Sequence, residues 1–359
     1  MTIKSSGQLS FTEIHDEFKT LGGTLDQKPY QLSEYLGLPV GMGLPQSGTI
    51  KFSDFYGKSS IRFVPEENWV AISDTQINGK YNIKECNLWD ALQAFGFTDP
   101  NGFYDITLPA DYWLWSDSTS KGGLIIPSNL TGNIIFRNKG IIIGKGGRGG
   151  GGTVNSGQVA TGGAGGPAIK VDNTASINFI NESAAYVAAG GGGGGSGGGT
   201  IGAGGGGGAG GGRGGTGYRA AGNPGAGGIL NRKGNDAPDD SDAGGGNGGG
   251  AGAGGGGWDN GSGKLNKPDS GSGGGGGRIL PGTGGTGGGG SRDTTGKTGG
   301  SSNNAGGGGG SGHGAGGGGW GARGGTCGGA GGVGGLAFDI ATDNGQVGIT
   351  NNGTIWGRD

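Results

Sequence analysis

Runs of four to six consecutive glycines fill much of the second half of this chain and restrict what it can fold into. The runs are Gly190–Gly195, Gly204–Gly208, Gly254–Gly257, Gly273–Gly277, Gly287–Gly290, Gly306–Gly310 and Gly316–Gly319. Glycine makes up 106 of the 359 residues, far above the roughly 7% of an average protein. Because glycine has no side chain to bury, backbone hydrogen bonds and close van der Waals contact must hold together any interior built from these runs.

Two known arrangements of glycine-rich chains can be compared with the sequence. Collagen requires strict Gly-X-Y spacing and abundant proline, and the chain has neither. A polyglycine strand with three residues per turn leaves every N–H and C=O pointing outward, so rods of this kind can bond to one another side by side. We therefore expect a polyglycine II sandwich, in which a six-residue tract spans about 19 Å. Disorder is the alternative, because an isolated glycine tract is a flexible coil.

The segments that interrupt the glycine tracts alternate between short and long. The short ones are Ser196–Ala203, Asn247–Ala253, Arg278–Thr286 and Ser311–Ala315, and the long ones are Tyr218–Ala243, Trp258–Ser272, Ser291–Ala305 and Trp320–Thr326. If the rods run up and down, alternate turns lie at opposite ends, and the long loops then form one composite surface. Aromatic and charged side chains on such loops are typical of protein recognition.

We expect the contacts with a binding partner to come from the polar and aromatic residues of these long loops. They include Tyr218, Arg219, Arg232, Asp239, Trp258, Asp259, Lys264, Arg292, Asp293 and Trp320. For Trp258 and Trp320, shielding of a rod edge explains the residue equally well. For each of the others, a solvated loop side chain is the alternative.

The first 120 residues have an ordinary composition and predict small α+β modules. In residues 1–60, the sequence Ser6–Ile14 is echoed at Ser47–Phe55, and each copy predicts a short strand that leads into a helix or turn. Between the copies, a capped helical turn is predicted at Ser33–Gly37. In residues 61–120, we expect a strand at Trp69–Ile72 and a helix at Leu88–Phe95. The aromatic residues Tyr112, Trp113 and Trp115 favour a core over a sugar site.

Three related segments predict a β-rich base for the glycine tracts. They are residues 133–144, 177–187 and 346–356, each with two β-rich stretches around an Asn turn. The predicted division is then 1–60, 61–120, a base at 121–189, a polyglycine II domain at 190–335 and a closing β segment at 336–359. The fold class is mixed, with α+β amino-terminal modules, a β-rich base and a polyglycine II sandwich with long loops at one end.

The sequence argues against enzymatic activity, cofactors and metals. The net charge of −2 is a poor match for nucleic acid, and no apolar run is long enough for a signal peptide or a membrane span.

The stretch Ser291–Thr298 lacks the first glycine of a nucleotide-binding loop. His15 and His313 have no partner ligands in the sequence, and the acids around Asp239 favour a solvated loop over a calcium site. Cys86 and Cys327 favour two free thiols over one long-range disulfide.

The tracts and loops over about residues 144–335 resemble the receptor-binding adhesins at the tips of tailed-bacteriophage long fibres. The echo at Ser6–Glu13 and Ser47–Asp54 also resembles segments of phage structural proteins. This resemblance implies that the amino-terminal region docks on a tail or fibre protein and that the loops bind an outer-membrane protein or surface glycan of a bacterium. It also implies a protein made in the host cytoplasm and incorporated into the virion, with homo-oligomerisation left open.

Residues 1–140 are longer and more divided than the family pattern, which leaves the mode of attachment and the copy number open. A glycine-rich structural or ice-binding protein is the alternative, although it predicts short and uniform turns. A flexible RNA-associated segment is a further one, and the near-neutral charge disfavours it.

Overall fold

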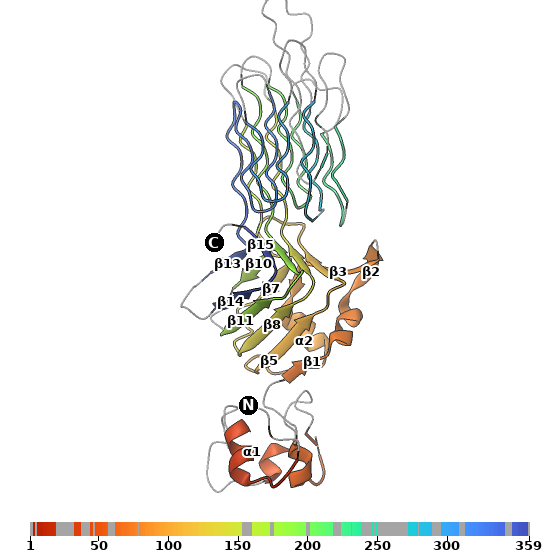
Figure 1. The fold of residues 1–359 in the computed structure, drawn as a ribbon, viewed down its shortest axis with the longest axis vertical. Coiled ribbons are helices and arrows are strands. Elements are labelled where there is room, and N and C mark those ends of the chain that lie inside the picture. Colours follow the sequence, from red (N-terminus) through yellow and green to blue (C-terminus); the bar gives the residue numbers. More distant parts are fainter. Residues whose placement is uncertain are drawn as a thin grey trace, which may run out of the picture.

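The computed structural model shows an elongated molecule of three parts. It describes residues 3, 6–18, 32–36, 44–45, 47–56, 62–77, 79–152, 160–172, 176–198, 202–217, 224–230, 232–237, 246, 248–249, 272–278, 280–288, 296–308, 313–341 and 347–357. Figure 1 shows a small amino-terminal unit at one end, a body of β-sheets in the middle and a bundle of extended glycine tracts at the other end.

The amino-terminal unit contains short helices around a small aromatic core. They are α1 (Phe11–Phe18) and the 3-10 helices η3 (Leu32–Tyr35) and η5 (Phe52–Phe55). Both copies of the repeat start a helix in the same way, because Glu13 accepts a hydrogen bond from the backbone of Ser10 and Asp54 accepts one from that of Lys51. The helical part of the prediction is confirmed. The short preceding strand is absent from the residues that the structure describes.

The middle body consists of short strands in three sheets. The strands are β1 (Arg62–Val64), β2 (Asp74–Ile77), β3 (Lys80–Lys84), β4 (Cys86–Asn87), β5 (Tyr104–Leu108), β6 (Tyr112–Trp115), β7 (Leu124–Ile126), β8 (Ile134–Asn138), β9 (Ile141–Ile143), β10 (Ile169–Val171), β11 (Ile177–Asn181), β12 (Tyr186–Ala188), β13 (Phe338–Ile340), β14 (Val347–Asn351) and β15 (Thr354–Trp356). The sheet orders are β1-β5-β8-β11-β14, β15-β12-β9-β6-β3-β2 and β13-β10-β7-β4.

These sheets are the three sides of a β-solenoid. The chain visits the five-stranded, the six-stranded and the four-stranded sheet in turn, and each circuit adds one parallel strand to every side. The predicted β segments are therefore rungs of one coil, with Ile134, Ile177 and Val347 in register. Each predicted Asn turn is a corner between two sheets, so the two β stretches around it do not pair with each other.

A ladder of asparagines runs along one corner inside the solenoid. Asn138 and Asn181 are fully buried, and the Nδ2 of Asn138 donates to the Oδ1 of Asn181 over 2.8 Å. The Nδ2 of Asn181 donates in turn to the Oδ1 of Asn351 over 2.9 Å. Phe136 and Phe179 stack beside this ladder with ring centroids 5.6 Å apart. Each rung thus repeats both an apolar and an amide contact of the previous rung.

Residues 61–120 do not form the separate module that the sequence predicts, because β1, β3, β4, β5 and β6 extend the same three sheets. The helix prediction at Leu88–Phe95 is confirmed by α2 (Leu88–Ala94), and Gly96 follows it with a φ of 91°. The strand prediction at Trp69–Ile72 is wrong, since Glu66–Ile72 is the 3-10 helix η6. Its turns of three residues bring both Trp69 and Ile72 against the core and leave Val70 and Ala71 between them exposed.

We predict that Asn181→Leu lowers the free energy of unfolding by about 3 kcal/mol, because it removes one of the two acceptors of the buried Nδ2 of Asn138 and the donor to Asn351. The measurement is chemical denaturation followed by circular dichroism. Asn178→Ala is the control, because Asn178 lies on the same strand and is exposed. Equal stability of the two variants would contradict a structural role for the ladder.

Candidate functional site

The glycine tracts leave the solenoid at one corner. The insertion 144–166 connects β9 to β10, and the insertion 190–335 connects β12 to β13. Both lie between the six-stranded and the four-stranded sheet, so the tracts start side by side, as Figure 1 shows. The solenoid therefore determines where the rods begin and in which direction they run.

The tract 190–198 donates its backbone N–H groups with a period of three residues. Gly191, Gly194 and Gly197 donate to the tract 202–210, over 2.8 to 2.9 Å. Gly190, Gly193 and Ser196 donate to the tract 160–166, whereas Gly192 and Gly195 donate to the tract 322–326. One strand thus bonds to three neighbours in rotation, which a β-strand with its period of two cannot do.

The carbonyl groups of the same tract bond to three further neighbours. Gly191 and Gly194 accept from the tract 144–152, Gly192 and Gly195 from the tract 313–320, and Gly190, Gly193 and Ser196 from the tract 329–335. These distances are 2.7 to 3.0 Å. The tract is therefore surrounded by six others, with the partners of its backbone groups in different directions. This is how a core without large side chains satisfies its polar groups.

Most interior positions of this lattice accept no Cβ. A Cβ on Gly193 would overlap the carbonyl of Arg148, and one on Gly205 would overlap the carbonyl of Gly194. Ala203, Ala209 and Ala315 are nevertheless buried within it. The lattice thus admits a methyl group at selected positions and requires glycine at those where another backbone lies in van der Waals contact.

The two ends of the lattice differ in their turns. Near the sheets, the described turns lie at 210–211, 280–281, 301–304 and 320–321, and Arg232 bonds back to Ile229 at a further one. At the far end, the described residues flank the stretches 153–159, 199–201, 218–223, 238–245, 289–295 and 309–312. The far end therefore collects connections of both predicted classes, short and long.

The predicted alternation of short and long loops is wrong. The long interruption Tyr218–Ala243 contains two further extended stretches, 224–230 and 233–237, joined by a turn near the sheets. The sequence analysis did not identify these stretches as tracts, because it expected only glycine and other small residues, and Pro224, Ile229 and Leu230 are larger. An outer tract can carry such side chains because one side of it faces away from the lattice, and Ile229 is 49% exposed.

Eight of the ten residues that we predicted to bind a partner lie outside the described residues. They are Tyr218, Arg219, Asp239, Trp258, Asp259, Lys264, Arg292 and Asp293. Arg232 is exposed, but its backbone bonds to Ile229 and Arg278 place it in a turn near the sheets. The structure therefore separates Arg232 from the flanks of the far-end loops.

Trp320 requires a correction. It is 1% exposed and packs with Trp113, Ile143 and Leu230 where the tracts meet the sheets. A side chain so enclosed offers no surface to a partner. The second explanation of this residue, shielding of glycine rods, is the one that fits, because Trp320 supplies apolar area that the glycines above it lack.

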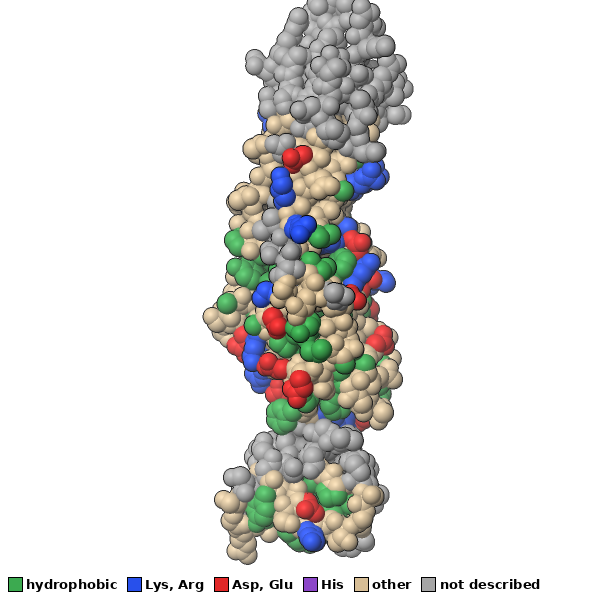
Figure 2. Space-filling model, turned by 90° about the vertical axis from the view of Figure 1, so that its right-hand side faces the viewer, with side chains coloured by type: hydrophobic (Ala, Val, Ile, Leu, Met, Phe, Trp, Pro, Cys, Tyr) green, Lys and Arg blue, Asp and Glu red, His purple; other side chains and the backbone are tan. Residues whose placement is uncertain are grey.

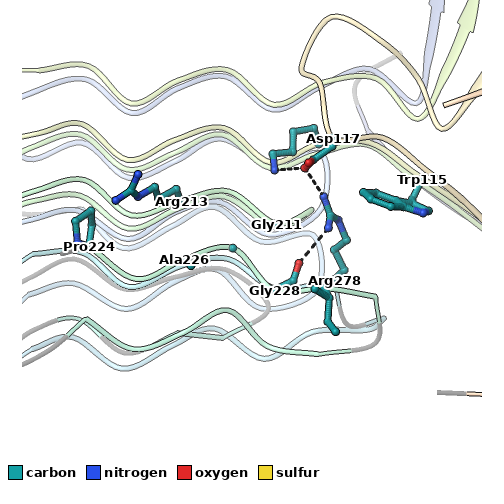
Figure 3. A pocket seen from close by; sticks show the side chains of 11 residues that line it. Trp115, Asp117, Gly211, Arg213, Pro224, Ala226, Gly228 and Arg278 are labelled. Atoms are coloured by element: carbon teal, nitrogen blue, oxygen red, sulfur yellow. Dashed lines mark hydrogen bonds and ion pairs between the residues drawn. The ribbon is translucent and has the colours of Figure 1, made fainter. Parts of the chain in front are cut away.

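A polar cluster joins the glycine region to the solenoid on one side, beside a cavity of about 520 Å³. Figure 3 shows Arg278 between the two parts. Its guanidinium donates to the Oδ1 of Asp117 over 2.9 Å and to the carbonyl of Gly228 over 3.1 Å, and it lies 4.5 Å from the ring centroid of Trp115. Lys145 also donates to Asp117. The sequence analysis missed this cluster, because no local motif links residues so far apart in the chain.

Burial and charge oppose each other at this cluster. Burial raises the pKa of Asp117, but hydrogen bonds and charge from Lys145 and Arg278 outweigh it and hold that pKa below its usual value. Burial lowers the pKa of Arg278, and Asp117 partly offsets this effect. The carboxylate therefore stays ionised and links the two parts. Figure 2 shows charged side chains gathered on the solenoid and at its junction with the glycine region.

The described residues contain two thiols, but no cluster of metal-binding side chains and no helix that could span a membrane. Cys86 and Cys327 form no disulfide with each other, and burial, with a smaller contribution from Asp90, raises the pKa of Cys86 to about 12. No group of three His, Cys, Asp or Glu side chains within the described ranges could hold a metal ion. In the same part of the chain, no helix is long and apolar enough to cross a membrane.

We predict that Gly193→Ala lowers the free energy of unfolding by about 2 kcal/mol or more, because the added Cβ would push the tract 144–152 away. Thermal unfolding measures the loss. Gly151→Ala is the matched control, since the nearest atom to its added Cβ would be the carbonyl oxygen of Thr216 at 3.7 Å. If both variants unfolded at the same temperature, close packing of the lattice would be contradicted.

We also predict a pH-dependent effect of Asp117→Asn. Because the pKa of Asp117 is lower in the folded chain, its ionisation stabilises the fold above the ordinary pKa of about 3.9, and this contribution disappears as the pH falls through the folded value. The variant should unfold more easily than the parent at neutral pH, and the difference should vanish in acid. Denaturation across pH 2–7 tests this prediction, with the exposed Glu67→Gln as control. A difference that persists unchanged in acid would refute it.

Comparisons with known proteins place the chain in a family. A family model described as phage tail fibre adhesin Gp38 matches residues 72–271. Among solved structures, the chain is similar to the crystal structure of the gp37-gp38 adhesin tip complex of the bacteriophage S16 long tail fiber. The identity is 16% and the TM-score 0.41, over 98% of this chain and 94% of that one. No curated protein matches the sequence. Because the family model covers more than half of the residues, the chain belongs to the Gp38 family of phage tail fibre adhesins.

Proposed function

We propose that this adhesin binds a receptor on the bacterial surface through the connections at the far end of its glycine lattice. The receptor is an outer-membrane protein or a surface glycan, and the role is attachment of the virion without enzymatic activity. The observation that carries the proposal is the gathering of the loop flanks at the end of the molecule farthest from the solenoid. Loops on a rigid support are the usual place for recognition residues.

We infer that the support is a polyglycine II lattice. The three-residue hydrogen-bond period and the six neighbours of the tract 190–198 support this assignment. In such a lattice, stability comes from backbone groups inside the tracts. Residues such as Tyr218, Arg219, Asp239, Trp258, Asp259, Lys264, Arg292 and Asp293 are then free to vary with the receptor. Arg232 and Trp320 no longer belong to this set, since they lie near the solenoid.

The amino-terminal unit is the part that we propose to hold the adhesin on a tail or fibre protein. It has its own apolar core, which includes Phe18, Tyr35 and Phe55. In Figure 1 it lies at the end opposite to the glycine tracts. A molecule attached there presents the far-end loops outward, as attachment to a cell requires.

We predict that replacing residues 218–223, 238–245, 258–271 and 289–295 by Gly-Ser linkers of equal length abolishes binding of the full chain to host cells. The reason is that these segments hold all eight of the remaining proposed contact residues, whereas the lattice does not depend on them. Flow cytometry with labelled protein measures the binding. Arg219→Ala should weaken it, and Arg232→Ala is the matched control that should leave it unchanged.

Unaltered cell binding after all four replacements would refute receptor recognition by the far-end loops. Loss of binding in Arg232→Ala alone would instead place the contact near the solenoid. In both cases, unchanged thermal unfolding shows that the lattice is intact.

A further inference from the structure

The last rung of the β-solenoid is left open. Among the described residues, the strands β13, β14 and β15 each end a sheet and pair on one side only, with β10, β11 and β12. Figure 1 shows β13 and β14 on the same side of the body, near the carboxyl terminus. Edge strands of natural proteins are commonly protected by charge or proline, but β14 reads Val-Gly-Ile-Thr-Asn and has neither.

The apolar interior of the solenoid reaches the surface at this rung. Ile349 stands in register with Phe179, which is 1% exposed, yet Ile349 itself is 45% exposed. Phe338, Ile340 and Ile355 pack on the same core and are only partly buried. The end therefore exposes both an apolar surface and strand edges.

The rungs below show which backbone groups of β14 point outward. The N–H of Ile134 donates to the carbonyl of Ser176 on the next rung in chain order, which we call forward. The N–H of Asn352 donates to the carbonyl of Asn181 on the previous rung, which we call backward. Alternate residues of a strand point to opposite sides, so the N–H groups of Ile349 and Asn351 point forward, as that of Ile134 does. No strand of the described residues receives them.

The asparagine ladder is also incomplete at this end. Asn138 and Asn181 each pass an Nδ2 hydrogen bond to the next rung. Asn351 accepts from Asn181 and from the N–H of Gly353, but its own Nδ2 has no acceptor among the described residues. A following rung with a side-chain oxygen at this corner would satisfy it.

The other end of the solenoid is built differently. There α2 and η6 cover part of the core, and Leu92 and Trp69 are fully buried. The edge strand β2 runs antiparallel to β3, whereas β1 and β4 are the parallel edge strands of the other two sheets.

We propose that the end formed by β13, β14 and β15 binds an extended segment of a second polypeptide, which adds a parallel strand to β14. The segment has an apolar residue beside Ile349 and an Asn or Asp oxygen beside the Nδ2 of Asn351. Backbone bonds provide the affinity, and the two side-chain positions provide the selectivity. This surface is separate from the far-end loops, so it does not depend on the proposed receptor binding.

The probe is a fluorescent peptide that copies residues 176–188, because β11 and β12 already stack as a rung in this solenoid. Fluorescence anisotropy with the full chain should show saturable binding with one peptide per chain. Ile349→Lys should weaken binding by about tenfold, since it places a charge in the apolar column and on the strand edge. Asn351→Asp should also weaken it, because it keeps the acceptor for Asn181 and removes only the free donor.

Two controls make the result specific. Val333→Lys changes another exposed apolar residue, 42% accessible, outside the solenoid end and should not alter binding. The peptide with Phe179→Lys should not bind. Absence of binding by the parent peptide, or equal binding to all protein variants, would overturn the proposal. A dimer of the full chain that Ile349→Lys dissociates in sedimentation would overturn it too, because a second copy would then cover this end.

Discussion

The hydrogen bond between backbone groups of neighbouring glycine tracts is the interaction on which the elongated half of this adhesin depends. Its three-residue period lets the tract 190–198 bond to six neighbours, so a core forms without large side chains. The same bond explains the composition. Where a neighbouring carbonyl lies against an α-carbon, as at Gly193, only glycine fits. Ordering so much glycine is entropically costly, and the cooperation of many tracts offsets that cost.

The β-solenoid aligns the first tracts of this lattice. Its parallel strands lie about 4.8 Å apart, so successive rungs end at the same corner at regular intervals and the tracts that follow them begin side by side. The apolar cluster around Trp320 and the pair of Arg278 with Asp117 then seal the junction. An apolar core thus supports a backbone core, and the direction of the lattice follows from the direction of the rungs.

Sequence reasoning succeeded where the signal was local. The helix starts at Ser10 and Lys51, the helix α2 and the three β segments all follow from short patterns. It failed where distant segments determine the outcome. Residues 61–120 have no internal sign that their strands join rungs formed by residues beyond 330. The tract 224–230 escaped detection because an outer rod tolerates Ile229, and Trp320 was misplaced because turn length does not reveal which end a turn occupies.

The division between the two cores has a consequence for how the protein can change. In the glycine lattice the stabilising groups are backbone atoms, which are the same whatever residues occupy the connections. In the solenoid the stabilising groups are side chains in fixed columns, such as Phe136 over Phe179 and Asn138 over Asn181. Substitutions in the far-end connections therefore leave the lattice bonds in place, whereas substitutions in the columns disturb the rung above and the rung below. A molecule with both cores can vary at one end while its base stays constant.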